Sequence, residues 1–264
     1  MSENREKNNR ILIITLCLVH LLLGLDINIV SVSLPTIAAK FDVTAGIATR
    51  VVWIYFLVLT CLLLGYGKLG DLKGFRNIYL TGILIFTLSS LLASFSYDFN
   101  FLVLSRILQA LGAGTLFALT PAIITAFIKP EKRGRIFGLN YSFTAFGGII
   151  GRALSGYLVE YFGWNSIFLI NIPIGITALA LGYYSLPAEK IINIKNKFDF
   201  TGSILIFLPL FGFLYVINTV QDFGFFSFEI LGIIILSIIF FIAFLIYEKK
   251  ISSYLCNHHS LFQF

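Results

Sequence analysis

The sequence predicts an all-α polytopic membrane protein, made of a six-helix bundle and two further transmembrane helices. Three observations predict this fold class. Hydrophobic residue types make up 58% of the 264 residues and charged types only 12%, whereas soluble domains contain about 25% charged residues. The mean hydropathy is +0.92. The few charges lie in short clusters between long apolar runs, so most of the chain must face lipid or other helices.

Membrane-crossing helices are expected at eight places. A helix that crosses the hydrocarbon core of a bilayer needs about 20 residues. Apolar stretches of about that length or longer are Ile11–Ala38, Thr49–Leu69, Ile78–Ser96, Phe99–Ile128, Ile136–Glu160, Asn165–Leu186, Phe200–Val220 and Phe228–Glu248. No small-residue cleavage site follows the first stretch, which carries Asp26, so we expect a retained helix there and not a cleaved signal peptide.

The longest connection follows Pro187 and is rich in Ile, Lys and Asn. This change of composition predicts a division of the chain into three parts. Residues 1–187 would form the six-helix transmembrane bundle, residues 188–199 a cytoplasmic linker, and residues 200–264 the two additional helices with a short tail.

The basic residues predict the orientation of the helices. Nearly all of the 19 Lys and Arg residues lie at the two ends of the chain or on alternate connections, whereas the opposite connections hold only Lys40 and Arg50. Cytoplasmic loops carry an excess of Lys and Arg. We therefore expect a multi-pass protein of the cell (plasma) membrane with both termini in the cytoplasm. This clustering also argues against nucleic-acid binding as the reason for the net charge of +6.

No pattern in the sequence predicts catalysis or metal binding. There is no GxSxG, HExxH or phosphate-binding loop and no pair of catalytic carboxylates. We therefore expect neither an enzyme nor a cofactor. Neither the cysteines nor the histidines of the C-terminal tail have the spacing of a metal site; these residues are Cys17, Cys61, Cys256, His258 and His259.

Two charges inside the apolar stretches are expected to lie in one layer of the membrane. Asp26 is about 13 Å below Pro35, and Arg106 is about 10 Å inside the helix end near Phe99, at about 1.5 Å per residue. Charges in a bilayer mark either function or a paired structural site. If the carboxyl group alternates between an ionised and a protonated state, it can couple transport to protons. The alternative is a static ion pair that joins two helices.

The expected helix at Ile136–Glu160 carries two stripes of small residues. Four-residue spacing of such residues lets a partner helix approach closely. The first stripe is Gly147, Gly151 and Ser155, and the second is Gly148, Arg152 and Gly156.

Arg152 interrupts the second stripe with a long cation. It lies about 13 Å from the helix end near Tyr161. Its guanidinium either extends outward to Glu160 or competes for Asp26.

Several motifs in the correct order resemble the major facilitator superfamily. The segment Gly67-Lys-Leu-Gly-Asp71-Leu-Lys-Gly74-Phe-Arg76 resembles the signature loop GxLaDrxGrk of that superfamily, with Leu72 in place of the usual arginine. Arg106-Ile-Leu-Gln109-Ala110-Leu-Gly112 resembles its RxxQGxG element, with Ala110 in place of glycine. The segment from Phe162 to Gly175, which includes Asn171, adds further support.

Within the superfamily, the chain resembles the N-terminal part of the fourteen-helix drug:proton antiporters (EmrB/QacA-like). Leu25-Asp26-Ile-Asn28-Ile-Val30 through Pro35 resembles their LDxTIVNVALP element. Gly151-Arg152-Ala-Leu-Ser155-Gly156 corresponds to their GPxxGG element but has arginine where proline is usual. Those antiporters have six helices, two linker helices and six more, and this chain corresponds to the six-helix major-facilitator N-terminal bundle and the two linkers.

The resemblance implies a transmembrane transporter that couples efflux of lipophilic, often cationic, drugs or related small molecules to protons. Its partners would be the substrate, protons, the lipid bilayer and a C-terminal half or a second copy. The rival interpretations are a truncated remnant that does not transport and one half of a split transporter.

The resemblance also implies residue roles. Asp26 and Arg106 would couple protons. The conformational latch would be Gly67, Asp71, Gly74 and Arg76. The helix-packing or antiporter motif would be Gly147, Gly148, Gly151, Arg152 and Gly156, with the close partner helix in the absent half.

Overall fold

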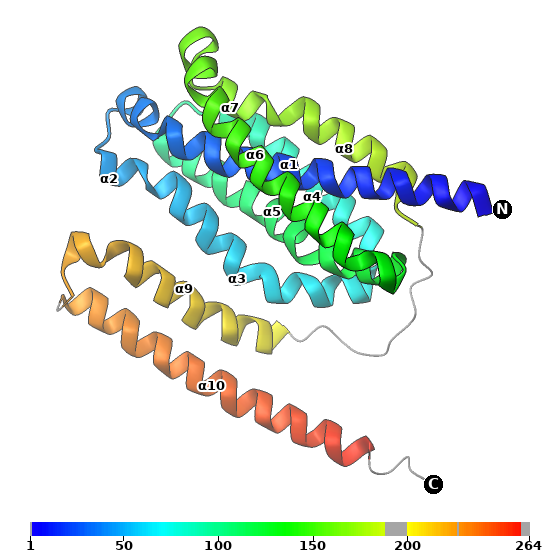
Figure 1. The fold of residues 1–264 in the computed structure, drawn as a ribbon. Coiled ribbons are helices and arrows are strands. Elements are labelled where there is room, and N and C mark those ends of the chain that lie inside the picture. Colours follow the sequence, from blue (N-terminus) through cyan, green and yellow to red (C-terminus); the bar gives the residue numbers. More distant parts are fainter. Residues whose placement is uncertain (1, 188–199, 226, 260–264) are drawn as a thin grey trace. The chain divides into compact units, whose positions relative to one another are not determined.

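The computed structural model describes residues 2–187, 200–225 and 227–259; side chains are left undescribed at 2–7, 64–65, 67–69, 71–73, 200, 203, 221–223 and 250–259. The described residues form helices and connections without a strand (Figure 1). The helices are α1 (Ser2–Phe41), α2 (Ala45–Ala48), α3 (Arg50–Lys73), α4 (Phe75–Ser94), α5 (Phe99–Phe127), α6 (Pro130–Phe162), α7 (Ser166–Leu169), α8 (Asn171–Ser185), α9 (Phe200–Phe223) and α10 (Phe228–His259). They belong to two units, Met1–Ile194 and Lys195–Phe264.

Each of the eight expected stretches corresponds to a long helix or, in one case, to the pair α7 and α8. The observed bounds differ where local chemistry sets a helix end. Pro130 occupies the first turn of α6, where its missing N–H costs nothing, so α6 begins six residues earlier than expected. Gly74, with φ of 85°, is the one residue between α3 and α4, and glycine adopts that φ without strain. The Asp98 carboxylate accepts a hydrogen bond of 2.7 Å from the Phe101 N–H and caps α5.

In the described part of the chain, 6 helical segments are long and apolar enough to cross a membrane. They are Asn8–Phe41, Ala45–Leu63, Phe75–Ser94, Phe99–Phe127, Ser166–Ser185 and Phe228–Lys249. Helix α6 is not among them because Asn140, Arg152 and several glycines lower its hydropathy, and α9 contributes only the shorter apolar helix Ile204–Val220. The fold class is therefore confirmed, whereas eight crossings remain a prediction.

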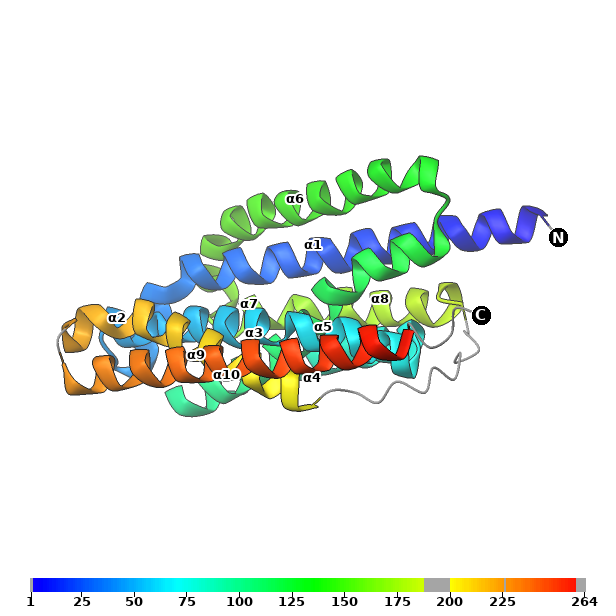
Figure 2. The same ribbon diagram turned by 90° about the horizontal axis from the view of Figure 1, so that it is seen from below.

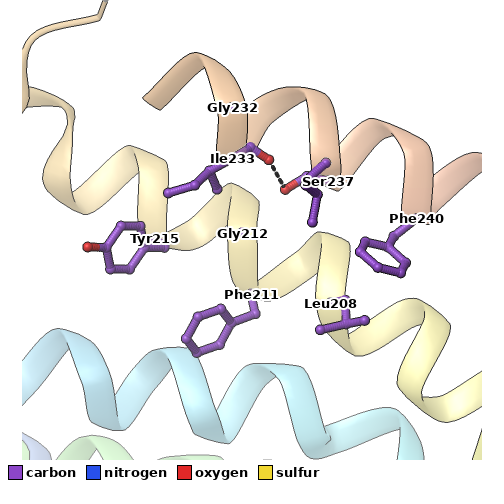
Figure 3. Close-up of a pocket in the computed structure, with 9 residues that line it drawn as sticks. Leu208, Phe211, Gly212, Tyr215, Gly232, Ile233, Ser237 and Phe240 are labelled. Carbon is purple, nitrogen blue, oxygen red and sulfur yellow. Dashed lines mark hydrogen bonds between the residues drawn. The ribbon is translucent and has the colours of Figure 1, made fainter. Parts of the chain in front are cut away.

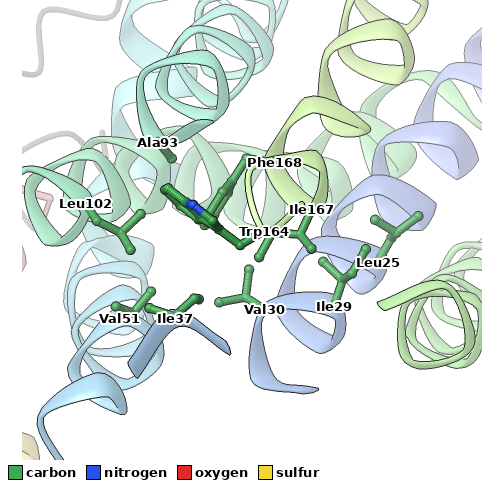
Figure 4. Close-up of a cluster of buried hydrophobic side chains, with 10 residues drawn as sticks. All are labelled: Leu25, Ile29, Val30, Ile37, Val51, Ala93, Leu102, Trp164, Ile167 and Phe168. Carbon is green, nitrogen blue, oxygen red and sulfur yellow. The ribbon is translucent and has the colours of Figure 1, made fainter. Parts of the chain in front are cut away.

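In the first unit, α1 packs against α6 and α8, and α5 packs against α3 and α4. Figure 2 shows α1 and α6 running alongside each other. One cluster of buried apolar residues in this unit draws side chains from α1, α3, α4, α5 and the segment around α7 (Figure 4). These side chains are Leu25, Ile29, Val30, Ile37, Val51, Ala93, Leu102, Trp164, Ile167 and Phe168. Because lipid tails are as apolar as these residues, van der Waals packing is what this core adds to stability.

In the second unit, α9 and α10 form an antiparallel pair, joined through Gly224 with φ of 81°. An apolar pocket of about 310 Å³ lies between the two helices (Figure 3). Gly212 and Ser237 face each other there. The Ser237 hydroxyl donates to the carbonyl oxygen of Ile233 at 2.7 Å, which satisfies it within its own helix.

Candidate functional site

Asp26 and Arg106 form a buried ion pair in the first unit. Arg106 Nη1 lies 2.8 Å from Asp26 Oδ2, and the two side chains are 1% and 0% exposed. Asp26 comes from α1 and Arg106 from α5. The structure thus brings together the two charges that depth along their helices placed in one layer.

Two side-chain amides complete the surroundings of the carboxylate. Gln109 Nε2 and Asn171 Nδ2 donate to Asp26 Oδ1 at 2.9 Å and 2.8 Å. Asp26 therefore accepts hydrogen bonds from three side chains on two other helices, α5 and α8. Bonds of this kind to an ionised acceptor are about twice as strong as those between neutral groups, so the site as it stands is complementary to the ionised carboxylate.

The Arg106 guanidinium is held on several sides. Nη1 also donates to Gln109 Oε1 at 2.5 Å, and Nε donates to the Val51 carbonyl oxygen at 3.2 Å. Its central carbon lies 4.1 Å from the centre of the Tyr55 ring and 6.0 Å from that of Phe168. Aromatic faces attract cations most strongly where water is excluded.

Ser90 on α4 joins the network. Its hydroxyl oxygen accepts from Gln109 Nε2 at 2.7 Å and from Asn171 Nδ2 at 3.5 Å, and it donates to the Phe86 carbonyl oxygen at 2.8 Å. Two buried polar atoms of the residues around the ion pair, Asn171 Oδ1 and the Tyr55 hydroxyl, have no hydrogen-bond partner among the described residues. The network thus links five helices, α1, α3, α4, α5 and α8, and retains polar atoms that are free to form further hydrogen bonds.

The motifs in the sequence contain Gln109 and Asn171, but the predicted coupling site consists of Asp26 and Arg106 alone, and Ser90 and Tyr55 were missed. One signal was available for Gln109, because residues three apart on a helix share a face and Gln109 follows Arg106 by three. Nothing in the sequence distinguishes Ser90 from the other serines of α4.

Arg152 takes neither of the partners that its depth suggested. Its Nε donates to Asn28 Oδ1 on α1 at 2.9 Å, and the residue is exposed. The expectation of Glu160 or Asp26 as its partner was wrong. Asp26 is enclosed by its own three donors, and the Asn28 amide is fixed in front of α6 by a 2.8 Å bond from Nδ2 to the Gly24 carbonyl oxygen.

The close partner of the first glycine stripe is α1 of the same unit. A Cβ on Gly147 would overlap the Leu21 carbonyl oxygen, and one on Gly151 would lie 2.7 Å from that of Leu25. The Ser155 hydroxyl lies 2.8 Å from that of Ser33. The expectation of a partner outside this bundle was therefore wrong, because the glycines already bring the α1 and α6 backbones into contact.

The two glycines of the second stripe, Gly148 and Gly156, differ in the space around them. A Cβ on Gly148 would lie 2.7 Å from Asn28 Nδ2, so this glycine makes room for the asparagine. A Cβ on Gly156 would meet no atom within 4 Å.

The proposed latch is described in part. Gly67 and Asp71 are described only as part of the α3 backbone. Arg76 Nη2 donates to the Tyr183 carbonyl oxygen on α8 at 2.8 Å, and its guanidinium lies 5.0 Å from the centre of the Tyr183 ring. Among the residues that the structure describes, no group of three His, Cys, Asp or Glu side chains could hold a metal ion.

Comparison with known proteins identifies the family. The sequence pattern of the Major Facilitator Superfamily matches residues 16–259. The chain belongs to the Major Facilitator Superfamily. Two solved superfamily structures share its fold, each with a TM-score of 0.58: a D-xylose-proton symporter, which is 17% identical and of which 66% is covered, and a peptide transporter POT, which is 15% identical and of which 48% is covered. The alignments cover 87% and 83% of this chain.

Two other transport and resistance proteins are similar to the chain in sequence. The riboflavin transporter RibZ of Clostridioides difficile is 37% identical over 199 residues, which are 75% of this chain and 44% of that protein. Multidrug resistance protein 3 of Bacillus subtilis is 27% identical over 252 residues, which are 93% of this chain and 48% of that protein. The chain thus spans about half the length of these relatives.

Proposed function

We propose that the chain is the N-terminal part of a fourteen-helix drug:proton antiporter, which exports lipophilic drugs or related small molecules across the cell membrane. The buried Asp26–Arg106 pair carries this proposal, because a carboxylate at membrane depth can take and release a proton. The match to multidrug resistance protein 3 over 93% of the chain supports the substrate class. On this proposal the chain is a carrier and not an enzyme, and both of its termini are cytoplasmic.

The coupling step follows from the hydrogen bonds around Asp26. When the carboxyl group binds a proton, it can no longer accept from Arg106, Gln109 and Asn171 as an anion. Arg106 then remains as a buried cation without its counter-ion, which costs several kcal/mol. A conformation that hydrates Arg106 becomes favoured, and the helices that carry these donors, α5 and α8, move relative to α1.

The second part of the proposal concerns the missing half. Alternating access requires two bundles that rock around a shared site, and the division into residues 1–187, 188–199 and 200–264 supplies one of them. A separate C-terminal half or a second copy would complete the carrier. The latch role of Gly67, Asp71, Gly74 and Arg76 belongs to this proposal, with Arg76 tying the start of α4 to the end of α8. The alternative is a truncated remnant that inserts and does not transport.

Reconstitution in liposomes tests the proposal. With the chain alone, we expect no uptake driven by a pH gradient, either of the cationic dye rhodamine 123 or of the anionic dye fluorescein. We expect uptake after co-reconstitution with the remaining C-terminal half of multidrug resistance protein 3, and loss of that uptake in Asp26→Asn. Uptake by the monomeric chain alone would contradict the missing-half proposal, and uptake that survives Asp26→Asn would contradict the coupling role. Uptake by a dimer of the chain would favour a second copy.

A second candidate function is the transport of a riboflavin-like molecule. The 37% identity to RibZ over 199 residues favours it. The same liposomes decide between the two functions: uptake of riboflavin that rhodamine 123 does not compete for would replace the drug-efflux proposal.

A further inference from the structure

Among the described residues of the first unit, Arg152 is a charge without a counter-ion near the depth of the ion pair. Asp26 and Arg106 neutralise each other in the interior. Arg152 donates to Asn28, two residues along α1 from Asp26, and it is exposed. It forms no ion pair with a carboxylate in the described part of the chain. Asn28 is about 5 Å from the middle of the span Asn8–Phe41, at about 1.5 Å per residue. The described surface of this unit therefore carries a net positive charge at membrane depth.

The Arg152 guanidinium has a fixed orientation, but only one of its three nitrogens forms a hydrogen bond among the described residues. Its Nε is fixed by Asn28 Oδ1, and the Asn28 amide is itself fixed by the Gly24 carbonyl oxygen. Among the described residues, Nη1 and Nη2 of Arg152 have no hydrogen-bond partner. These two nitrogens form a planar fork that matches the two oxygens of a carboxylate, phosphate or sulfonate.

The surroundings of Arg152 leave room for such a group. Gly156, one turn further along α6, is open. On α1 the turn after Asn28 exposes the Ser31 hydroxyl and the 47% exposed Val32, and Ile149 on α6 is 66% exposed. Residues three and four apart share a helix face, so Ser31 and Val32 lie on the face of α1 that carries Asn28, and Ile149 and Gly156 lie on the face of α6 that carries Arg152. The Ser31 hydroxyl donates to the Ile27 carbonyl oxygen at 2.8 Å. The exposed surface on these two faces is mainly apolar, a setting that suits an anion attached to an apolar body.

An exposed arginine at this depth is unfavourable against lipid tails and would repel a cationic substrate. We propose that Arg152 and Asn28 form an anion subsite, and that the transported molecule is an amphipathic anion bound through its carboxylate, phosphate or sulfonate group. This inference rests on the proposed transport function and names its substrate class. It departs from the cationic substrates that the resemblance to drug antiporters implies.

Two xanthene dyes of similar shape and opposite charge test the inference by binding alone. Fluorescein is an anion and rhodamine 123 a cation at neutral pH. We expect the purified full chain in lipid nanodiscs to bind fluorescein at least tenfold more tightly than rhodamine 123, measured by fluorescence polarisation. Tighter binding of rhodamine 123, or equal binding of both dyes, would overturn the inference without any variant.

Variants then locate the site. Arg152→Gln should weaken fluorescein binding by roughly tenfold or more, since a hydrogen bond to a charged group is worth that much, and Arg152→Lys should retain most of it. Asn28→Asp should also weaken it, because the new carboxylate neutralises Arg152. Arg50→Gln removes an exposed cation outside this layer and is the matched control. Unchanged fluorescein binding in Arg152→Gln, or an equal loss in Arg50→Gln, would overturn the inference.

The binding experiment and the transport experiment can fail independently of each other. Proton-driven uptake of rhodamine 123 without binding of fluorescein would refute the anion subsite and leave proton-coupled efflux standing. Arg152-dependent binding of fluorescein without any proton-driven uptake would support the subsite and count against the transport proposal.

Discussion

Asn171 on α8 donates a 2.8 Å hydrogen bond to the Asp26 carboxylate on α1, so the ion pair is held from a third helix as well as from α5. Asn171 is fully buried. The contact makes the amide of Asn171 part of the charged site, although it carries no charge itself.

Replacing Asn171 should therefore destabilise the first unit. We expect Asn171→Ala to lower the free energy of unfolding by about 1.5–3 kcal/mol, because a bond to a charged acceptor is lost inside the protein. Exposed Asn77 on α4 is the control, and Asn77→Ala should change it by less than about 0.5 kcal/mol. Denaturant unfolding in detergent measures both, and equal effects of the two changes would count against the described contact.

The ion pair should show strong coupling in a double-mutant cycle. Removing one member of a buried pair costs about 3–5 kcal/mol of stability, because the other charge stays buried without a partner. We expect Asp26→Asn to destabilise the protein more than Asp26→Asn combined with Arg106→Gln. The two effects would be additive to within about 0.5 kcal/mol if the side chains did not interact, and thermal unfolding in detergent distinguishes these results.

The contact between α1 and α6 should be intolerant of a single methyl group at Gly147. We expect Gly147→Ala to cost about 1–3 kcal/mol, since the new Cβ overlaps the Leu21 carbonyl oxygen and forces the backbones apart. Gly138 lies on the same helix with no atom within 4 Å of an added Cβ. Gly138→Ala should be neutral or stabilise by roughly 0.5–1 kcal/mol. A similar cost at both positions would mean that helix flexibility, and not the close approach, explains the glycines.

The predicted orientation can be tested by cysteine labelling. In a background without the native cysteines, Cys at Tyr97, which is 78% exposed between α4 and α5, should react with a membrane-impermeant maleimide added outside intact cells. Cys at Lys132, exposed at the start of α6, should react only after the cells are opened. Labelling of both positions from the same side would refute the eight-crossing topology.

The sequence was sufficient for the helices and for the pairing of Asp26 with Arg106. Helix periodicity has a fixed rise, so counting residues from helix ends gives depth, and two opposite charges at one depth in a bilayer have strong reason to meet. Depth also placed Arg152 near that layer.

The sequence does not show which face of each helix meets its neighbour. The partner of Arg152 depends on which face of α6 meets α1, and this is decided by the close approach at Gly147 and Gly151. Uncharged members of the site, such as Ser90, were missed for a related reason. A buried serine can bond its own helix, so its presence in an apolar stretch predicts no partner.

The ribosome makes α1, with its acidic residue, before it makes the helices that carry the partners of that residue. Asp26 is made 80 residues before Arg106 and 145 before Asn171. At about 5–20 residues per second, the first interval lasts about 4–16 s. During it, an acidic group without its partners costs about 2.5–3.5 kcal/mol at the centre of a membrane helix. The contact that stabilises the finished bundle is thus absent when α1 enters the bilayer, and the nascent chain depends on the apolar residues around Asp26, or on the insertion machinery, until α5 is made.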